Sequence, residues 1–348
     1  MQASRHARVL TSKSPNTVYL TLSVALLGTG LLYLTQGAFA IPFKHVLHAL
    51  WASDVAKDLS QTIIWDIRLP RLALASLSGA VLGLSGSVMQ SLFRNPLADP
   101  SLIGVTAGAS LGASLAIFLT SSQLYSAQSS LVILSGGAFC GGLLACLLVY
   151  LLAKTSTGFS VSTMLLAGIA VTAFAGSIGN VLEFFVDNTA LRRISLWRMG
   201  GLDAASTAQV AVLLIPATGL AILSWRMRTA LNLMLLGDAH ARFLGIHVTR
   251  VRILLIIAVA VGVSTSVAMA GTMAFVGLMA PHFVRLLLGP DNVTLLPASA
   301  LMGALLLTAS DLVARLIIAP SEIPAGVVTA LLGVPFFLFL LRRHRNAL

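Results

Sequence analysis

Long runs of apolar residues, separated by short polar segments, dominate the pattern of the chain. The first run extends from Val18 to Leu34, and the stretch from Val251 to Leu288 covers 38 residues. One straight helix of that length would measure roughly 57 Å, almost twice the ~30 Å of membrane hydrocarbon, so we expect a turn near Gly271. The other runs lie near residues 72–92, 101–120, 131–153, 161–186, 208–225, 295–319 and 323–341. Together the runs predict about ten membrane-spanning helices.

The composition favours a protein that folds in lipid. Hydrophobic residues make up 57% of the chain and charged residues 9%, whereas soluble domains carry roughly 25% charged residues. The runs suit helices, which satisfy their own backbone hydrogen bonds inside lipid, and they are too continuous for barrel strands. We therefore predict an all-α integral membrane protein with a single transmembrane domain over residues 1–348.

Cysteine and charge exclude several other classes of protein. Cys140 and Cys146 lie in one apolar run without a CxxC or Cys/His spacing, so we interpret them as small helix residues and predict no metal site. The net charge is +11, but the basic residues lie at helix ends rather than in one stripe. This distribution argues against nucleic acid as a partner and favours membrane lipid.

The N-terminus resembles a signal peptide, because Arg5, Arg8 and Lys13 precede the first apolar run. That run is longer than the usual 7–15 residues of a signal peptide, so we expect an uncleaved first helix. An even number of helices places both termini on one side of the membrane. That side would hold 14 of the 22 basic residues, and the positive-inside rule makes it cytoplasmic.

The other side would hold eight basic residues, which is many for an outer face. Headgroup contact is one explanation. A basic ring that receives an acidic partner or an anionic solute is the other, and charge alone leaves both open. Six of these residues fall at or near outer helix ends: Arg68, Arg71, Arg192, Arg193, Arg198 and Arg315.

Enzyme signatures give little support for catalysis by this chain. The sequence has no HExxH and no GxxxxGK[ST] phosphate loop. The segments Gly108-Ala-Ser-Leu-Gly112 and Gly83-Leu-Ser-Gly86 fit patterns found around nucleophilic serines, but a suitably placed histidine base is lacking. Close packing of small residues between helices explains them better than an intramembrane serine protease.

Residues 226–250 form a predicted cytoplasmic segment. Asp238 can cap a short helix and Gly245 can end it in the left-handed conformation. Phe243 and Leu244 would then be exposed without lipid to cover them. Such a helix is suited to docking into a groove of a soluble partner.

From Arg68 onward, a series of motifs resembles the iron-siderophore, haem and vitamin B12 permease family of type II ABC importers. The resemblance covers nearly the whole chain from that point, in order. The matching segments are Arg68-Leu-Pro-Arg71, Gly79–Gln90, Asn95-Pro-Leu-Ala-Asp-Pro100, Gly104 with 107–109, 166–168, 191–192 with 197–201, 237–245, 280–285 with Gly289, Asp311 to Arg315, and 322–336.

The resemblance implies a homodimer of ten-helix subunits in the bacterial inner membrane, with two cytoplasmic ATPase subunits and a periplasmic binding protein. It implies that Arg68, Arg71 and Arg315 dock acidic residues of the binding protein. Asn95 and Leu97 would form part of a cytoplasmic gate with the Ser160 to Ser162 turn, although a plain turn before Pro96 is the alternative. The residues implied in coupling to the ATPase are Gly237, Asp238, Ala241, Arg242, Leu244 and Gly245.

Each of the two carboxylates Asp311 and Glu183 has two possible interpretations. Asp311 and Arg315 share a helix face, so they could form a structural ion pair as well as take part in docking. Glu183 is a carboxylate near the outer end of an apolar helix and has no evident partner in the sequence. It could face the central path or a partner side chain.

For the substrate we favour haem, because the segment from Asp187 to Gly201 resembles haem permeases and Arg192 and Arg193 could pair with propionates. Trp197 would lie on the same path. A ferric siderophore or vitamin B12 is the alternative, and a secondary transporter is a rival class. We expect no permanently bound cofactor, with ATP held by the partner subunit.

Overall fold

The computed structural model describes residues 14–51, 59–121, 127–155 and 158–345, and helices account for nearly all of this structure. The predicted basic segment at the N-terminus lies outside the described residues. The elements in the first half are α1 (Pro15–Thr35), α2 (Phe43–Trp51), α3 (Leu59–Thr62), a π-helix η1 (Ile63–Arg68), α4 (Leu69–Phe93), a 3₁₀ helix η2 (Pro100–Ile103), α5 (Val105–Ser121), α6 (Ala127–Ala153) and α7 (Val161–Phe185).

The second half continues the same pattern, with short helices between long ones. Its elements are α8 (Asn188–Arg198), α9 (Thr207–Arg226), α10 (Arg228–Leu235), α11 (Asp238–Phe243), α12 (Val248–Ala270), α13 (Val276–Leu288), α14 (Asn292–Leu316) and α15 (Ala325–Arg345). A hairpin of two-residue strands, β1 (Lys154–Thr155) and β2 (Gly158–Phe159), is a small departure from the predicted all-α fold.

Seven of the described helices are long and apolar enough to cross a membrane, and α5, α13 and α15 contribute shorter apolar stretches. The predicted turn near Gly271 is confirmed, because α12 ends at Ala270 and Gly271 adopts a φ of +70°. The short amphipathic helices α2 and α8 were not predicted, since their apolar positions are too few to stand out among the spans.

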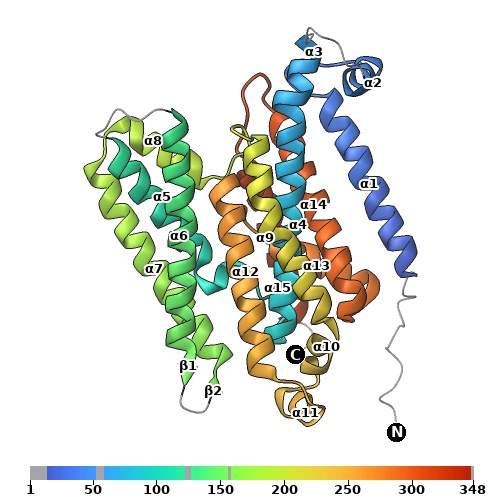
Figure 1. Ribbon diagram of the computed structural model, residues 1–348, viewed down its shortest axis with the longest axis vertical. Coiled ribbons are helices and arrows are strands. Elements are labelled where there is room, and N and C mark those ends of the chain that lie inside the picture. Colours follow the sequence, from blue (N-terminus) through green and yellow to red (C-terminus); the bar gives the residue numbers. More distant parts are fainter. Residues whose placement is uncertain (1–13, 52–58, 122–126, 156–157, 346–348) are drawn as a thin grey trace.

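The described helices lie in two groups in Figure 1, with α5 to α8 on one side and α1, α4 and the later long helices on the other. Loops and short helices lie at both ends of the bundle. One end carries α2, α3 and α8, and the other carries α10, α11 and the β1–β2 hairpin, with the start of α1 and the end of α15.

Glycines set the closest contacts between helices. Gly108 and Gly112 of α5 face the backbone of Gly141 and Gly137 in α6, so a Cβ at Gly112 would lie 2.0 Å from the Gly137 oxygen. The GxSxG pattern is therefore a packing motif, as predicted. The buried Ser85 hydroxyl of the second pattern has no hydrogen-bond partner among the residues that the structure describes, so no base contacts it there.

Candidate functional site

An ion-pair cluster lies where α4, α14 and the segment before α15 meet. Arg71 binds Asp311 through two hydrogen bonds of 2.9 Å, from Nε and Nη2, and its Nη1 lies 2.6 Å from Glu322 Oε2. The Tyr33 hydroxyl of α1 also donates to Asp311. The Arg71 guanidinium and the Asp311 carboxylate thus connect α1, α4, α14 and the segment that follows α14.

Arg68 and Arg315 complete this outer cluster, which consists of Tyr33, Arg68, Arg71, Asp311, Arg315 and Glu322. Arg68 donates to the backbone carbonyls of Leu34 and Phe39. The Arg315 guanidinium lies 4.5 Å from the centre of the Tyr33 ring, and its Nε lies 3.9 Å from Glu322. The structure brings the three arginines together, while the docking role that the resemblance implied stays a prediction, and their burial was not predicted.

The burial of these arginines has an energetic consequence. Arg68, Arg71 and Arg315 are exposed by only 2%, 6% and 6%. An ion buried from water costs several kcal/mol unless it is well paired, and the cluster sets two carboxylates against three guanidiniums. One positive charge remains in excess, and the Glu322 side chain, 38% exposed, is the carboxylate nearest to solvent.

The ion pair that the sequence left open as one interpretation of Asp311 and Arg315 does not form among the residues described. Asp311 is bound by Arg71 and Tyr33, and the carboxylate near Arg315 is Glu322. Residues four apart on a helix are neighbours, but the buried Asp311 carboxylate finds a two-pronged partner on α4 instead. No pattern of residues predicted that Tyr33 would bind Asp311.

Of the two interpretations of Glu183, the structure agrees with the one in which it faces a partner side chain. Its Oε1 lies 2.5 Å from Arg198 Nη1, across the bend between α7 and α8. Arg192 and Arg193 are exposed on α8 and form no ion pair with any described residue, while Trp197 is half-buried against the main core. Asp187 begins α8 by accepting from the amide of Ala190 at 2.7 Å.

The two predicted gate turns lie at the end of the bundle that carries α10 and α11 (Figure 1). Asn95 Oδ1 accepts from the Leu97 amide at 2.9 Å, which is the turn expected from the sequence. Ser160 begins α7 by accepting from the Thr163 amide at 3.2 Å, and its hydroxyl lies 3.1 Å from that of Ser162. No hydrogen bond joins the two turns within the part of the chain that the structure describes.

Leu97 reaches a cavity inside the bundle. The cavity has a volume of about 310 Å³, and it is lined also by Asp99, Met273, Phe275 and Phe337. It therefore lies between the loop after α4 and the break between α12 and α13. Among the residues described, no group of His, Cys, Asp or Glu could hold a metal ion.

The predicted cytoplasmic segment forms α10 and α11. Phe243 is 93% exposed and Leu244 is 55% exposed, as expected for a docking helix, whereas Ala241 is buried. Gly245 ends the segment at a φ of +84°, as predicted. Arg242 is exposed beside Phe243.

The predicted capping role of Asp238 is wrong, because Gly237 takes the N-cap position with a φ of +113°. Asp238 binds Arg252 of α12 at 2.8 Å instead and lies 3.5 Å from Arg94 at the end of α4. This carboxylate links α11 to the C-terminal end of α4 and to α12. Sequence reasoning missed the contact because it joins three different helices, and residues fourteen or more positions apart are not neighbours on one helix.

Comparison with known proteins places the chain in one family. Residues 25–343 match the FecCD transport family. The hemin transport system permease protein HmuU of Yersinia pestis is 38% identical over 316 residues, or 89% of this chain and 91% of that protein. The cobalamin import system permease protein BtuC of Halobacterium salinarum is 41% identical over 310 residues, or 88% and 80%.

A solved structure agrees with this assignment. An ABC transporter described as of the metal-chelate type, in an inward-facing conformation, superposes with a TM-score of 0.82 at 29% identity. The match covers 94% of this chain and 99% of that one. Taken with the apolar helices, the outer cluster and the exposed α11, these similarities show that the chain belongs to the FecCD transport family and is a multi-pass permease of its haem, siderophore and vitamin B12 importers.

Proposed function

We propose that this chain is the membrane-spanning subunit of an ATP-driven importer that moves haem from the periplasm to the cytoplasm across the bacterial inner membrane. Two copies would form the channel, and two separate ATPase subunits would supply ATP hydrolysis. The observation that carries the proposal is the nearly fully exposed Phe243 on α11 in a chain of this permease family.

The orientation follows from charge. We take the seven long apolar helices together with the three shorter ones as ten spans, and the end with α10 and α11 is rich in arginine. By the positive-inside rule this end is cytoplasmic, so both termini face the ATPase and the outer cluster faces the periplasm. The three guanidiniums of Arg68, Arg71 and Arg315 carry one positive charge more than the two carboxylates neutralise. Acidic residues of a binding protein would be attracted to this charge, and they would meet the partly exposed Glu322 first.

The coupling role gives a direct prediction. Replacing both Phe243 and Leu244 by alanine should weaken association with the ATPase subunit by about 30-fold or more, because large exposed side chains that fill a partner's groove contribute about 2 kcal/mol or more. Affinity measured on the purified full chain tests this. Phe174→Ala is the control, since this side chain is 68% exposed on α7 and lies outside the cytoplasmic segment. Equal losses in both variants would argue against docking through α11.

For the substrate, the exposed arginines of α8 support haem. Both Arg192 and Arg193 lack carboxylate partners among the described residues, so their guanidiniums are available to an anionic solute such as haem with its propionates. A ferric siderophore or a corrin remains the second candidate, because relatives of similar identity are described for hemin and for cobalamin.

The double substitution Arg192→Gln with Arg193→Gln should slow haem uptake about tenfold or more, since each charge-assisted contact contributes about 1.5–3 kcal/mol. Basal ATP hydrolysis and docking of the binding protein should stay near wild type, because the outer cluster is untouched. Uptake and hydrolysis are to be measured on the same proteoliposomes. Wild-type haem flux would show that these arginines contact headgroups instead.

A further inference from the structure

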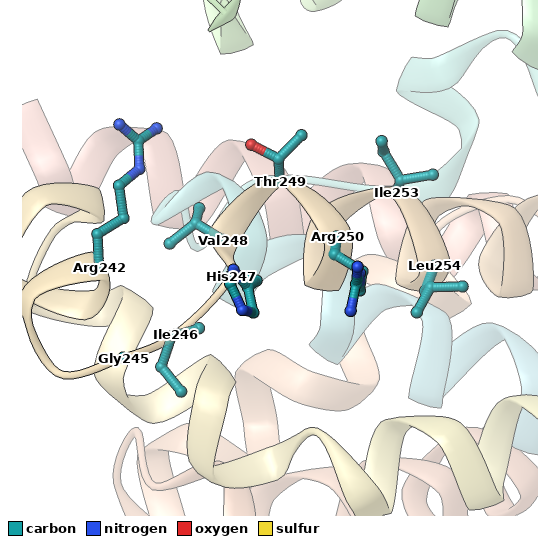
Figure 2. Close-up of a pocket in the computed structure, with 9 residues that line it drawn as sticks. All are labelled: Arg242, Gly245, Ile246, His247, Val248, Thr249, Arg250, Ile253 and Leu254. Carbon is teal, nitrogen blue, oxygen red and sulfur yellow. The ribbon is translucent and has the colours of Figure 1, made fainter.

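The start of α12 carries an open pocket with a basic rim. The pocket has a volume of about 620 Å³ and takes in residues of α11, the turn after it and the first two turns of α12. Three basic side chains line the pocket, Arg242 from α11, His247 from the turn and Arg250 from the first turn of α12. In Figure 2 His247 and Arg250 point to the same side, whereas Arg242 points to the other side. Ile253 and Leu254 follow one turn farther along the helix and add apolar lining.

The positive charge of this rim is not neutralised within the protein. Arg242 and Arg250 are exposed, and neither forms an ion pair with any residue the structure describes. No carboxylate lines the pocket. Asp238, the nearest acidic residue in the sequence, is held by Arg252 and Arg94. The pocket is therefore complementary to an anion.

A second, apolar cavity continues from the first along the outside of the bundle. It has a volume of about 190 Å³ and lies between α6 and α12, where it is lined by Leu143, Leu147, Ile257 and Val261. Ile253 lines both cavities, so they adjoin. Leu147 and Ile257 are 51% and 54% exposed, so the groove is open on the surface of the single chain.

The dimensions fit one leaflet of a bilayer. Val261 lies eleven positions after Arg250, which corresponds to about 16.5 Å along a helix at 1.5 Å per residue. Half the hydrocarbon thickness of a bilayer is about 15 Å. A molecule that filled both cavities would have an anionic head at the cytoplasmic surface and an apolar chain reaching toward the membrane centre.

We propose that the basic pocket and the groove between α6 and α12 form a binding site for an anionic phospholipid of the cytoplasmic leaflet. His247 and Arg250 donate to the headgroup phosphate, and one acyl chain lies along Ile253, Ile257 and Val261. Basic pockets between membrane helices on this side of a bilayer bind such headgroups. The site rests on the orientation proposed above. A soluble ATPase subunit could meet the basic rim, but it could not fill the groove at membrane depth.

The test uses the full chain purified in detergent, without an ATPase subunit. Native mass spectrometry after addition of dioleoyl-phosphatidylglycerol or dioleoyl-phosphatidylcholine counts the lipids that stay bound. We expect the wild type to retain the phosphatidylglycerol in preference. Arg250→Gln should lower that preference about fivefold, since each cation near an anionic headgroup contributes a factor of that size. Leu147→Trp, which fills the groove, should lower retention of phosphatidylglycerol as well.

The matched control is Arg226→Gln, which removes the same charge at the exposed end of α9, away from the pocket. This variant should keep the wild-type preference. Equal retention of the two lipids by the wild type, or the same loss in the control, would overturn the site. A loss of ATPase binding in Arg250→Gln with unchanged lipid preference would also overturn it and assign the rim to the ATPase. The measurement of lipid retention does not depend on transport activity. If the proposed transport function fails, the lipid site can therefore still be tested.

Discussion

Asp311→Ala should lower the free energy of unfolding by about 3–5 kcal/mol, because it leaves the buried Arg71 guanidinium without its two-pronged partner. The Asp311 carboxylate is fully buried and accepts both hydrogen bonds at 2.9 Å. The Tyr33 hydroxyl would lose its acceptor too. Titration of the purified protein with SDS in mixed micelles measures this loss.

The double variant Arg71→Met with Asp311→Leu distinguishes the net contribution of the ion pair to stability from the cost of leaving one buried ion without its partner. Replacing both ions with apolar side chains removes the desolvation cost as well as the attraction, so most of the lost stability should return. Glu322 would still stand beside Arg315. Wild-type stability for Asp311→Ala would mean that the pairing contributes little and that Arg71 is hydrated in the folded protein.

Gly86→Ala should be the most damaging of the small substitutions, at about 3 kcal/mol or more. A Cβ at this position of α4 would lie 1.7 Å from the Gly277 carbonyl oxygen and 2.6 Å from its carbon. Both contacts are with backbone, so no change of side-chain rotamer can relieve them. The two helices α4 and α13 would have to separate, and the cavity beside Gly277 would change shape.

Gly179→Ala in α7 is the matched control for this substitution. Nothing lies within 4 Å of the Cβ that it would add. An alanine there should be neutral or should stabilise the helix by up to about 1 kcal/mol, because glycine is the poorer helix former. Similar losses in the two variants, measured by the same titration, would contradict the assignment of the Gly86 effect to close backbone packing.

The sequence predicts the membrane helices of this protein well, for a plain physical reason. Spans are set by the length of apolar runs, which is a local property of the chain, and the break at Gly271 follows from comparing one run with the bilayer thickness. The exposed face of α11 was also predictable. Its apolar side chains occur in a polar segment between spans, where neither lipid nor neighbouring apolar residues in the sequence would bury them.

The ion pairs could not be predicted from the sequence. Arg71 and Asp311 are 240 positions apart, and the pairing depends on how α4 packs against α14. Helical periodicity gives only neighbours three or four residues apart, which suggested Arg315 for Asp311 and left Glu183 without a partner. Arg198 reaches Glu183 because α8 folds back from α7, and no pattern of residues predicted that bend.

Uptake in proteoliposomes tests most directly whether this chain is a permease driven by a separate ATPase. Haem is supplied with a binding protein on the outside, to the chain alone or together with the ATPase subunit and enclosed ATP. We expect uptake only when the ATPase and ATP are both present, and no uptake when a proton or sodium gradient replaces them. Haem accumulation by the chain alone in response to such a gradient would contradict the account and identify a secondary transporter.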